Sequence, residues 1–275
     1  MIAAHRMDPA RRELYVEGPT DKIFLEWLAA ENKSARALVR TVDLIHVPDV
    51  NEGGNRERLV RFMELIKDEE VRIKGLIDAD NHHFQNPKRG YPPNLWITDW
   101  RSIESYVISE FYLDKALRLG CAIDSVPAKS LFPIISSTTR KIAAIRYLSE
   151  SENLRLPVNE YRWLKYIDFN SKGGLTPDVE GILRSLLQAA HISVARLAEL
   201  TTKLVEVEAT LAGLEDQYVL HGHDFMKILT EQLKKMGVKL DDAGRLMWTA
   251  FERDRLTDFP TLSSVVTYLC DDRTM

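Results

Sequence analysis

The first 110 residues alternate between two hydrophobic periodicities, and this alternation limits the fold more than any other feature. Four short apolar runs have the length and residue types of strands: residues 14–16, 42–47, 73–77 and 95–98. Two stretches between them repeat apolar residues at helical spacing: Ile23, Phe24, Trp27 and Leu28, then Leu59, Phe62, Met63 and Ile66. Strands that alternate with helices fold as βαβ units on a parallel sheet. We therefore predict an α/β domain over residues 1–112, with a further helix beginning near Ser102.

From about Leu113 onward the strand signals fade and the apolar pattern becomes mostly helical. Thr176 and Pro177 are typical of a helix start, with Thr as the cap and Pro in the first turn. A later stripe keeps a spacing of three and four residues: Leu197, Leu200, Leu204, Val207, Leu211 and Leu214. Because it spans under three heptads, it favours an intramolecular helical hairpin or bundle over a dimer or partner surface. Residues 113–275 are predicted to be a mainly helical region packed on the first domain, available as a substrate or partner surface.

The composition is that of a globular chain with a large core. Its 275 residues are 45% hydrophobic, which is enough to fold without disulfides or metals. The two cysteines, Cys121 and Cys270, are far apart and lack partners at metal-ligand spacing, so we expect neither a disulfide framework nor a zinc knuckle. No apolar run approaches the roughly 18 residues that span a bilayer. A cytoplasmic protein without membrane contact is expected.

The net charge of -4 argues against a general nucleic-acid coat protein, which would carry a basic footprint. The charge is unevenly distributed, however. Residues 81–175 hold 13 Lys and Arg against 9 Asp and Glu, whereas the remaining residues hold 24 against 32. A basic middle beside an acidic cluster is compatible with a polyanionic substrate that is gripped near a metal site.

Four acidic residues follow two of the predicted strands. Glu17 comes directly after the first strand, and Asp21 lies one helical turn later. Asp78 and Asp80 follow the third strand, and their spacing of two places both side chains on one side of an extended backbone. Because the carboxyl ends of parallel strands share one edge of a sheet, we expect all four carboxylates to converge there.

Carboxylates that converge either raise one another's pKa or recruit a cation. Hard oxygen ligands select Mg²⁺ or Mn²⁺ over zinc, and both ions suit phosphoryl transfer, in which they activate water and neutralise the phosphate. Taken singly, an acid that follows a strand is more often a helix cap or a solvated turn residue. The occurrence of both acidic motifs at matching strand ends favours a metal site.

Both acidic motifs resemble those of a family of nucleic-acid enzymes. VEGPTDKIFLEWL resembles the first motif of Toprim domains, the catalytic glutamate module of primases, topoisomerases and OLD-family nucleases, and LIDAD resembles their paired-aspartate motif. The EGxTDxxFL form is most similar to the OLD branch. WITDWRSIESYVI is similar to an acidic segment of small stand-alone OLD-like proteins, including the AriB-type effectors of the PARIS phage-defence system. The resemblance covers about residues 13–110, with GHDFMKIL at 222–229 as a weaker further match.

The resemblance implies a Toprim fold, which is Rossmann-like, and roles for individual residues. Glu17 would be the catalytic glutamate, with Asp78 and Asp80 also catalytic. The implied metal ligands are Glu17, Asp21, Asp78, Asp80 and Glu104, the last as a second acidic position. The OLD pattern also uses a catalytic lysine late in the site, for which Lys172 in the Gly-flanked NSKGG is the candidate. Because OLD-like proteins usually work beside an ATPase, a separate OLD- or ABC-like ATPase partner is implied.

Two basic segments are candidate nucleic-acid contacts. The stretch YRWLKY at 161–166 interleaves aromatic and cationic side chains, a combination that can stack bases and track phosphates. Such a stretch is more often a helix with its aromatics in the core. Within it, Arg162 and Lys165 are the assigned contacts. Arg101 is a third candidate, either for a phosphate or for an ion pair with Glu104.

Two histidine-containing segments have simpler interpretations. His82 and His83 follow the paired aspartates, but hard-cation sites rarely need imidazole, so we expect loop residues. His223 and Asp224 lie in a Gly-flanked GHD turn, where capping of the following helix is the expected role.

Two functions from different classes fit these observations. The first is a metal-dependent nuclease that cleaves phosphodiester bonds in RNA, such as tRNA, or in DNA, as a toxic effector of anti-phage defence. The second is a catalytically silent Toprim-like module that binds a nucleotide or a partner protein. The sequence has no Walker A loop and no GxGxxG, so ATP hydrolysis by this chain alone is not expected. The expected partners are a separate ATPase or a second copy of the chain.

Overall fold

The computed structural model describes residues 5, 7–8, 11–30, 37–47, 54–80, 90–121 and 128–270. His82 and His83 lie outside these ranges. The chain divides into two compact units, one formed by residues 1–103 with 252–275 and the other by residues 104–251. The sequence analysis placed one boundary at residue 112 and assigned residues 252–275 to the helical region, whereas the structure places this segment in the first unit.

A four-stranded parallel sheet forms the centre of the first unit, in the order β2-β1-β3-β4. Its strands are β1 (Glu13–Val16), β2 (Leu38–Thr41), β3 (Ile73–Ile77) and β4 (Leu95–Ile97). The parallel α/β prediction is confirmed. The prediction of a strand over 42–47 is wrong, because β2 ends at Thr41 and a 3-10 helix, η1 (Val42–Leu44), follows. Val42 and Val47 are buried in the core without pairing as strand residues, which explains the apolar run.

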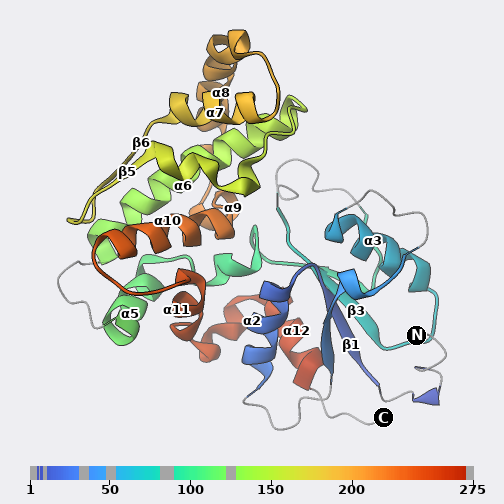
Figure 1. The fold of residues 1–275 in the computed structure, drawn as a ribbon. Helices are drawn as coiled ribbons and strands as arrows, with labels where there is room; N and C mark the ends of the chain where they lie inside the picture. Colours follow the sequence, from blue (N-terminus) through green and yellow to red (C-terminus); the bar gives the residue numbers. More distant parts are fainter. Residues whose placement is uncertain are drawn as a thin grey trace. The chain divides into compact units, whose positions relative to one another are not determined.

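Helices cover both faces of this sheet. α3 (Asn55–Ile66) lies on one face, and α2 (Pro19–Ala29) lies on the other with α12 (Pro260–Cys270) against it (Figure 1). All four apolar residues predicted for the core face of α3 are buried. On α2 the predicted core face is shifted by one residue. Phe24, Leu25 and Leu28 are buried, whereas Ile23, which was predicted to face the core, is exposed.

Long-range hydrogen bonds hold α12 in the first unit. The carboxylate of Asp99 accepts from the backbone N–H groups of Thr261 at 2.8 Å and Leu262 at 3.1 Å, which satisfies two donors in the first turn of the helix. The hydroxyl of Tyr268 donates to the carbonyl of Arg72 at 2.6 Å. A 3-10 helix, η6 (Arg253–Asp258), precedes α12. These contacts join segments more than 160 residues apart, so no local pattern could predict them.

The second unit is mainly helical. Its α-helices are α5 (Glu110–Cys121), α6 (Ala128–Ser151), α7 (Val179–Ala189), α8 (Leu197–Leu211), α9 (Asp216–Val219), α10 (Gly222–Lys235) and α11 (Ala243–Thr249). The long helix α6 lies between α8 and α10 (Figure 1). The 3-10 helices are η2 (Ile103–Val107), η3 (Val158–Glu160), η4 (Arg162–Tyr166) and η5 (Val194–Arg196). A short antiparallel hairpin joins β5 (Ile167–Phe169) to β6 (Leu175–Pro177).

The apolar stripe of residues 197–214 is core of the second unit. On α8, Leu197, Leu200, Leu204, Val207 and Leu211 are buried, and the helix packs on α6 and α7. The intramolecular interpretation is therefore confirmed. The predicted helix start at Thr176 and Pro177 is wrong: both lie in β6, and Asp178 caps α7 by accepting from the N–H of Gly181 at 2.9 Å.

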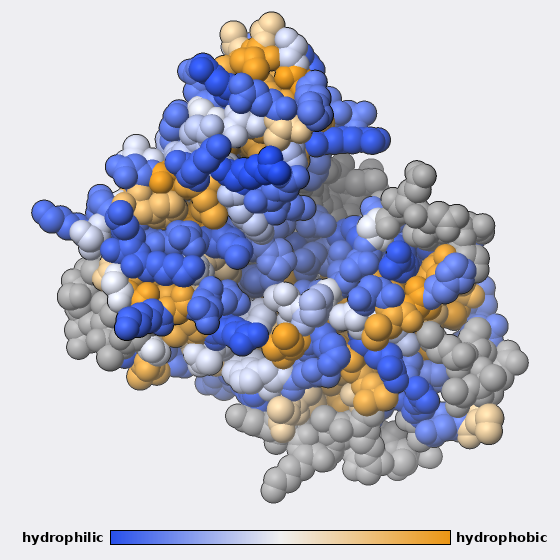
Figure 2. All heavy atoms as spheres, in the orientation of Figure 1, coloured by the Kyte–Doolittle hydropathy of each residue, from blue (hydrophilic) through white to orange (hydrophobic). Residues whose placement is uncertain are grey.

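The surface is mostly hydrophilic on the face that Figure 2 shows, with small groups of hydrophobic residues between the polar ones. None of the helices in the described ranges is long and apolar enough to cross a membrane.

Candidate functional site

Glu17 lies directly after β1, at the carboxyl edge of the sheet. Its Oε1 accepts a hydrogen bond from the backbone N–H of Asp78 at 2.9 Å, and its carbonyl accepts from the side chain of Asn55 at 2.7 Å. The side chain is 23% exposed. Burial and the nearby charge of Asp80 raise the pKa of Glu17 to about 7, although the Asp78 N–H and the Arg56 guanidinium oppose this rise. Glu17 is therefore a carboxyl group that exchanges its proton near neutral pH.

Further hydrogen bonds fix residues 78–80, directly after β3. The Oδ1 of Asp78 accepts from the N–H of Ile103 at 3.0 Å, and the N–H of Ala79 donates to the Oγ1 of Thr98 at 2.8 Å. Asp80 has a φ of 47°, in the left-handed region, and its N–H donates to the carbonyl of Arg101 at 2.8 Å. The turn at Asp80 means that the two aspartates do not follow the extended spacing expected from the sequence. Their positions are nonetheless strongly determined.

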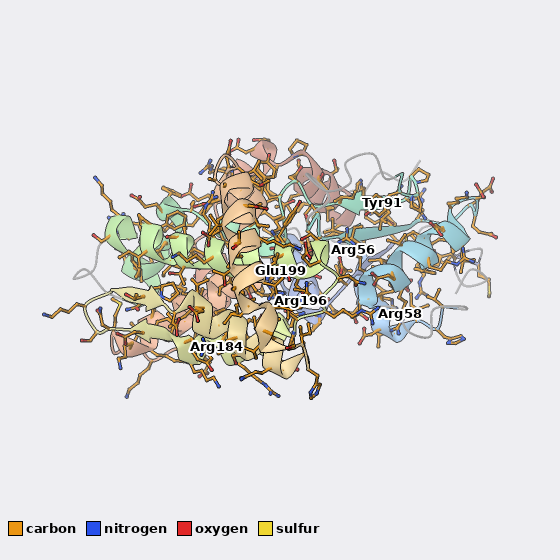
Figure 3. All side chains as sticks on the ribbon, turned by 90° about the horizontal axis from the view of Figure 1, so that it is seen from above. Arg56, Arg58, Tyr91, Arg184, Arg196 and Glu199 are labelled. Carbon is orange, nitrogen blue, oxygen red and sulfur yellow. The ribbon has the colours of Figure 1, made fainter. Side chains whose placement is uncertain are left out.

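Arg56, in the first turn of α3, binds this acidic edge. Its Nη1 donates to the carbonyl of Asp78 at 2.5 Å and to Oδ2 of Asp80 at 2.9 Å, and it lies 3.7 Å from Oε1 of Glu17. Its Nη2 donates to the hydroxyl of Tyr91 at 3.3 Å, and Figure 3 shows the two side chains near each other. Sequence reasoning missed Arg56. The available signal was its place at the start of a helix that follows a strand, which puts it at the carboxyl edge.

Asp21 has a structural role at the start of α2. Its Oδ2 accepts from the N–H of Gly18 at 3.0 Å, and a carboxylate in the first turn is also favoured by the helix dipole. The simpler of the two sequence interpretations, a helix cap, describes this contact. Asp21 is not among the groups that contact Arg56 in the described ranges.

Glu104 belongs to the second unit, where it has different surroundings. The residue is 1% exposed, and neither carboxylate oxygen has a hydrogen-bond donor among the described residues. The Nδ1 of His223 lies 3.4 Å from its Oε1. Tyr161 interacts electrostatically with Glu104. Burial, together with the carboxylates of Asp224 and Glu104, raises the pKa of Tyr161 to about 12, while Arg146 opposes the rise. A buried carboxylate with so few partners needs a cation or a proton to be stable.

A buried ion pair ties α6 to α10 in the same unit. The Nε and Nη2 atoms of Arg146 donate to the two carboxylate oxygens of Asp224 at 2.6 and 2.7 Å. Asp224 is fully buried, so the GHD turn contributes an interhelical ion pair rather than a simple cap.

The remaining predicted residues are dispersed. Lys172 is exposed in the turn between β5 and β6, where its backbone N–H donates to Oδ1 of Asn170 at 3.0 Å. Arg101 is 2% exposed, which leaves little surface for a phosphate. Arg162 and Lys165 are exposed on η4, with Arg162 paired to Glu160 at 2.7 Å. Trp163 between them is core, and its Nε1–H donates to the carbonyl of Val158 at 2.8 Å.

The oxygen-rich edge of the first unit fits a hard divalent cation. In the described ranges no three Asp, Glu, His or Cys side chains come together as a complete metal cage, so the expected four-carboxylate cluster is not assembled there. Instead, Glu17, Asp78 and Asp80 each place an oxygen atom near the Arg56 guanidinium and so form a smaller set of oxygen donors. Because Mg²⁺ keeps several waters and is usually bound through one or two carboxylates, the chemistry of this smaller set is compatible with such an ion.

No protein-family model matches the sequence, and no curated protein matches it.

Proposed function

We propose that this protein is a Mg²⁺- or Mn²⁺-dependent nuclease of the Toprim type. The observation that carries the proposal is the pairing of Glu17 and Asp80 at the ends of β1 and β3. Burial and the nearby charge of Asp80 raise the pKa of Glu17 to about 7, and the Arg56 guanidinium lies within 4 Å of an oxygen of each carboxylate. Two coupled carboxylates at this edge of a parallel sheet form a site for a hard cation and its phosphate ligand.

The residues of this edge would divide the work. Glu17 and Asp80 would hold the cation, with Asp78 as a further oxygen donor. When bound, the cation would neutralise the phosphate and activate a water molecule. As a carboxylate beside the cation, Glu17 would also be placed to accept a proton from a reacting group. Thr98 fixes the backbone at Ala79, between the two aspartates, by accepting a hydrogen bond from its N–H.

The substrate and setting in this proposal come from the resemblance. RNA such as tRNA is the first candidate and DNA the second, and the biological role would be that of a toxic effector in cytoplasmic anti-phage defence. A separate ATPase would restrain or trigger the nuclease. On the second unit, the exposed Arg162 and Lys165 are suited to contact the phosphate backbone.

A catalytically silent module is the alternative, and one observation favours it. Arg56 already neutralises part of the acidic edge through its contacts with Asp80 and Glu17. An arginine that held these acids permanently would leave no role for a divalent cation.

The deciding experiment incubates purified protein with tRNA, single-stranded DNA and duplex DNA in Mg²⁺, in Mn²⁺ and in EDTA. We expect cleavage of at least one substrate only with a divalent cation. Glu17→Gln should abolish cleavage. Glu64→Gln, which removes the charge of an exposed acid on α3, should leave cleavage unchanged. Cleavage that persists in EDTA or in Glu17→Gln would overturn the proposal. Absence of both cleavage and metal-induced thermal stabilisation would establish the silent module.

A further inference from the structure

Among the described residues, Arg56 contacts all three strand-end residues of the acidic edge. Its Nη1 lies within 4 Å of oxygens from Glu17, Asp78 and Asp80, and its side chain is only 19% exposed. The guanidinium is thus held by the groups that the proposed function assigns to a metal ion.

A divalent cation and this guanidinium compete for the same oxygens. Oδ2 of Asp80 accepts from Arg56 at 2.9 Å, and a cation bound by Asp80 and Glu17 would lie within a few ångströms of Nη1. Like charges at that separation repel strongly in a partly buried site. Binding of the cation must therefore move the guanidinium or be weakened by it.

The net charge of the acidic edge determines whether a phosphate can bind before or after the cation. Counted as formal charges, Glu17, Asp78 and Asp80 contribute up to three negative charges against the one positive charge of Arg56, and such an excess repels a phosphate. A divalent cation brings this sum to zero. A released guanidinium, with planar N–H donors that match two phosphate oxygens, is then suited to bind the incoming substrate.

We propose that Arg56 is an exchangeable counter-cation, which partly neutralises Glu17 and Asp80 in the metal-free protein and moves to a substrate phosphate when a divalent cation takes its place. This inference rests on the proposed nuclease function. The hydrogen bond from Arg56 to the Tyr91 hydroxyl does not involve the acidic residues, so this contact can persist during the exchange.

Arg58 supplies a matched control. It lies two residues further along α3, about 200° around the helix axis, and Figure 3 shows it apart from Arg56 and Tyr91. Replacing either arginine by Gln changes the net charge equally, so a general electrostatic effect would be the same in both variants. A specific effect would appear in only one.

The experiment measures two equilibria in wild-type protein, Arg56→Gln, Arg56→Lys and Arg58→Gln. The first is Mn²⁺ affinity by calorimetry without nucleic acid. The second is the affinity for tRNA, and for any DNA that the nuclease cleaves, over a range of salt concentrations, with Ca²⁺ as a cation that does not support rapid cleavage. Circular dichroism and thermal melts confirm that each variant is folded.

We expect Arg56→Gln to bind Mn²⁺ about tenfold more tightly or better, because a competing charge is gone. The same variant should bind nucleic acid more weakly, with a salt slope reduced by about one phosphate contact. Arg56→Lys should keep wild-type Mn²⁺ affinity and still lose nucleic-acid affinity, and Arg58→Gln should match wild type in both. Unchanged or weaker Mn²⁺ binding in Arg56→Gln overturns the proposal, as does unchanged nucleic-acid binding. If wild-type protein binds no Mn²⁺, the nuclease proposal itself has failed.

Discussion

The carboxylate of Glu17 accepts a hydrogen bond from the backbone N–H of Asp78 at 2.9 Å, which joins the ends of the two central strands. Glutamine at this position could still accept that hydrogen bond but would carry no charge. The Glu17→Gln variant therefore separates the electrostatic role of the carboxylate from its structural role.

We predict that Glu17→Gln makes the metal-free protein more stable than wild type above neutral pH. Burial and Asp80 raise the pKa of Glu17 to about 7 from its ordinary value of 4.5, so the folded protein favours the protonated form. The stabilisation from that proton is complete below pH 4.5 and is lost as the pH rises through 7. Wild type should thus lose up to about 3 kcal/mol relative to the variant across this interval. Urea unfolding in EDTA at several pH values measures the difference, and parallel curves for the two proteins would refute the assignment.

The opposite pH dependence is expected for Glu13, at the start of β1. Its buried carboxylate accepts from Arg11 at 2.6 Å, Tyr15 at 2.8 Å and Arg40 at 2.9 Å. Burial opposes ionisation, but these donors prevail and lower the pKa of Glu13 to about 2. Its contribution is therefore present above pH 4.5 and lost as the pH falls towards 2. Glu13→Gln should cost about 3 kcal/mol at pH 7 and almost nothing at pH 2. Equal losses at both pH values would show that shape, not charge, matters there.

The buried pair between Arg146 and Asp224 should be costly to break. Arg146→Met leaves a fully buried carboxylate without its main partner, and we expect a loss of about 3–5 kcal/mol in the free energy of unfolding. The double variant Arg146→Met with Asp224→Leu should recover much of this loss. Arg184→Met, which breaks an exposed pair with Glu180, is the control and should cost well under about 1 kcal/mol. A loss in Arg146→Met no larger than in the control would mean that water reaches Asp224.

Local patterns were sufficient for the elements whose core faces repeat regularly. The apolar periodicity predicted β1, β3 and α3. It also predicted that Glu17, Asp78 and Asp80 lie just after the ends of two strands. The error at residues 42–47 arose because Val42 and Val47 are buried by α3 without joining a strand ladder. Periodicity reports burial, and strand pairing requires more than burial.

Long-range contacts explain what the sequence did not reveal. Arg56 reaches the acidic edge only because the first turn of α3 lies beside the end of β3. The place of α12 depends on Asp99 and Arg72, both far away in the chain. The sequence allowed two interpretations of Asp21. The hydrogen bond from the Gly18 N–H at 3.0 Å agrees with the local one, a helix cap, and the role of Asp21 as a metal ligand stays a prediction.

Glu104 gives the sharpest test of the roles that the resemblance implies. Its two carboxylate oxygens are buried without hydrogen-bond donors among the described residues, and His223 Nδ1 is 3.4 Å away. A buried charge with so little compensation destabilises the folded state, so we predict that Glu104→Gln raises the melting temperature in EDTA. If Glu104 also binds a metal, the variant should lose part of the rise in melting temperature that Mn²⁺ produces in wild type. His223→Gln, which keeps a polar group of similar size on an exposed side chain, controls for changes in the histidine itself. A lower melting temperature in EDTA together with a full response to Mn²⁺ would make Glu104 a structural residue and remove it from the metal site.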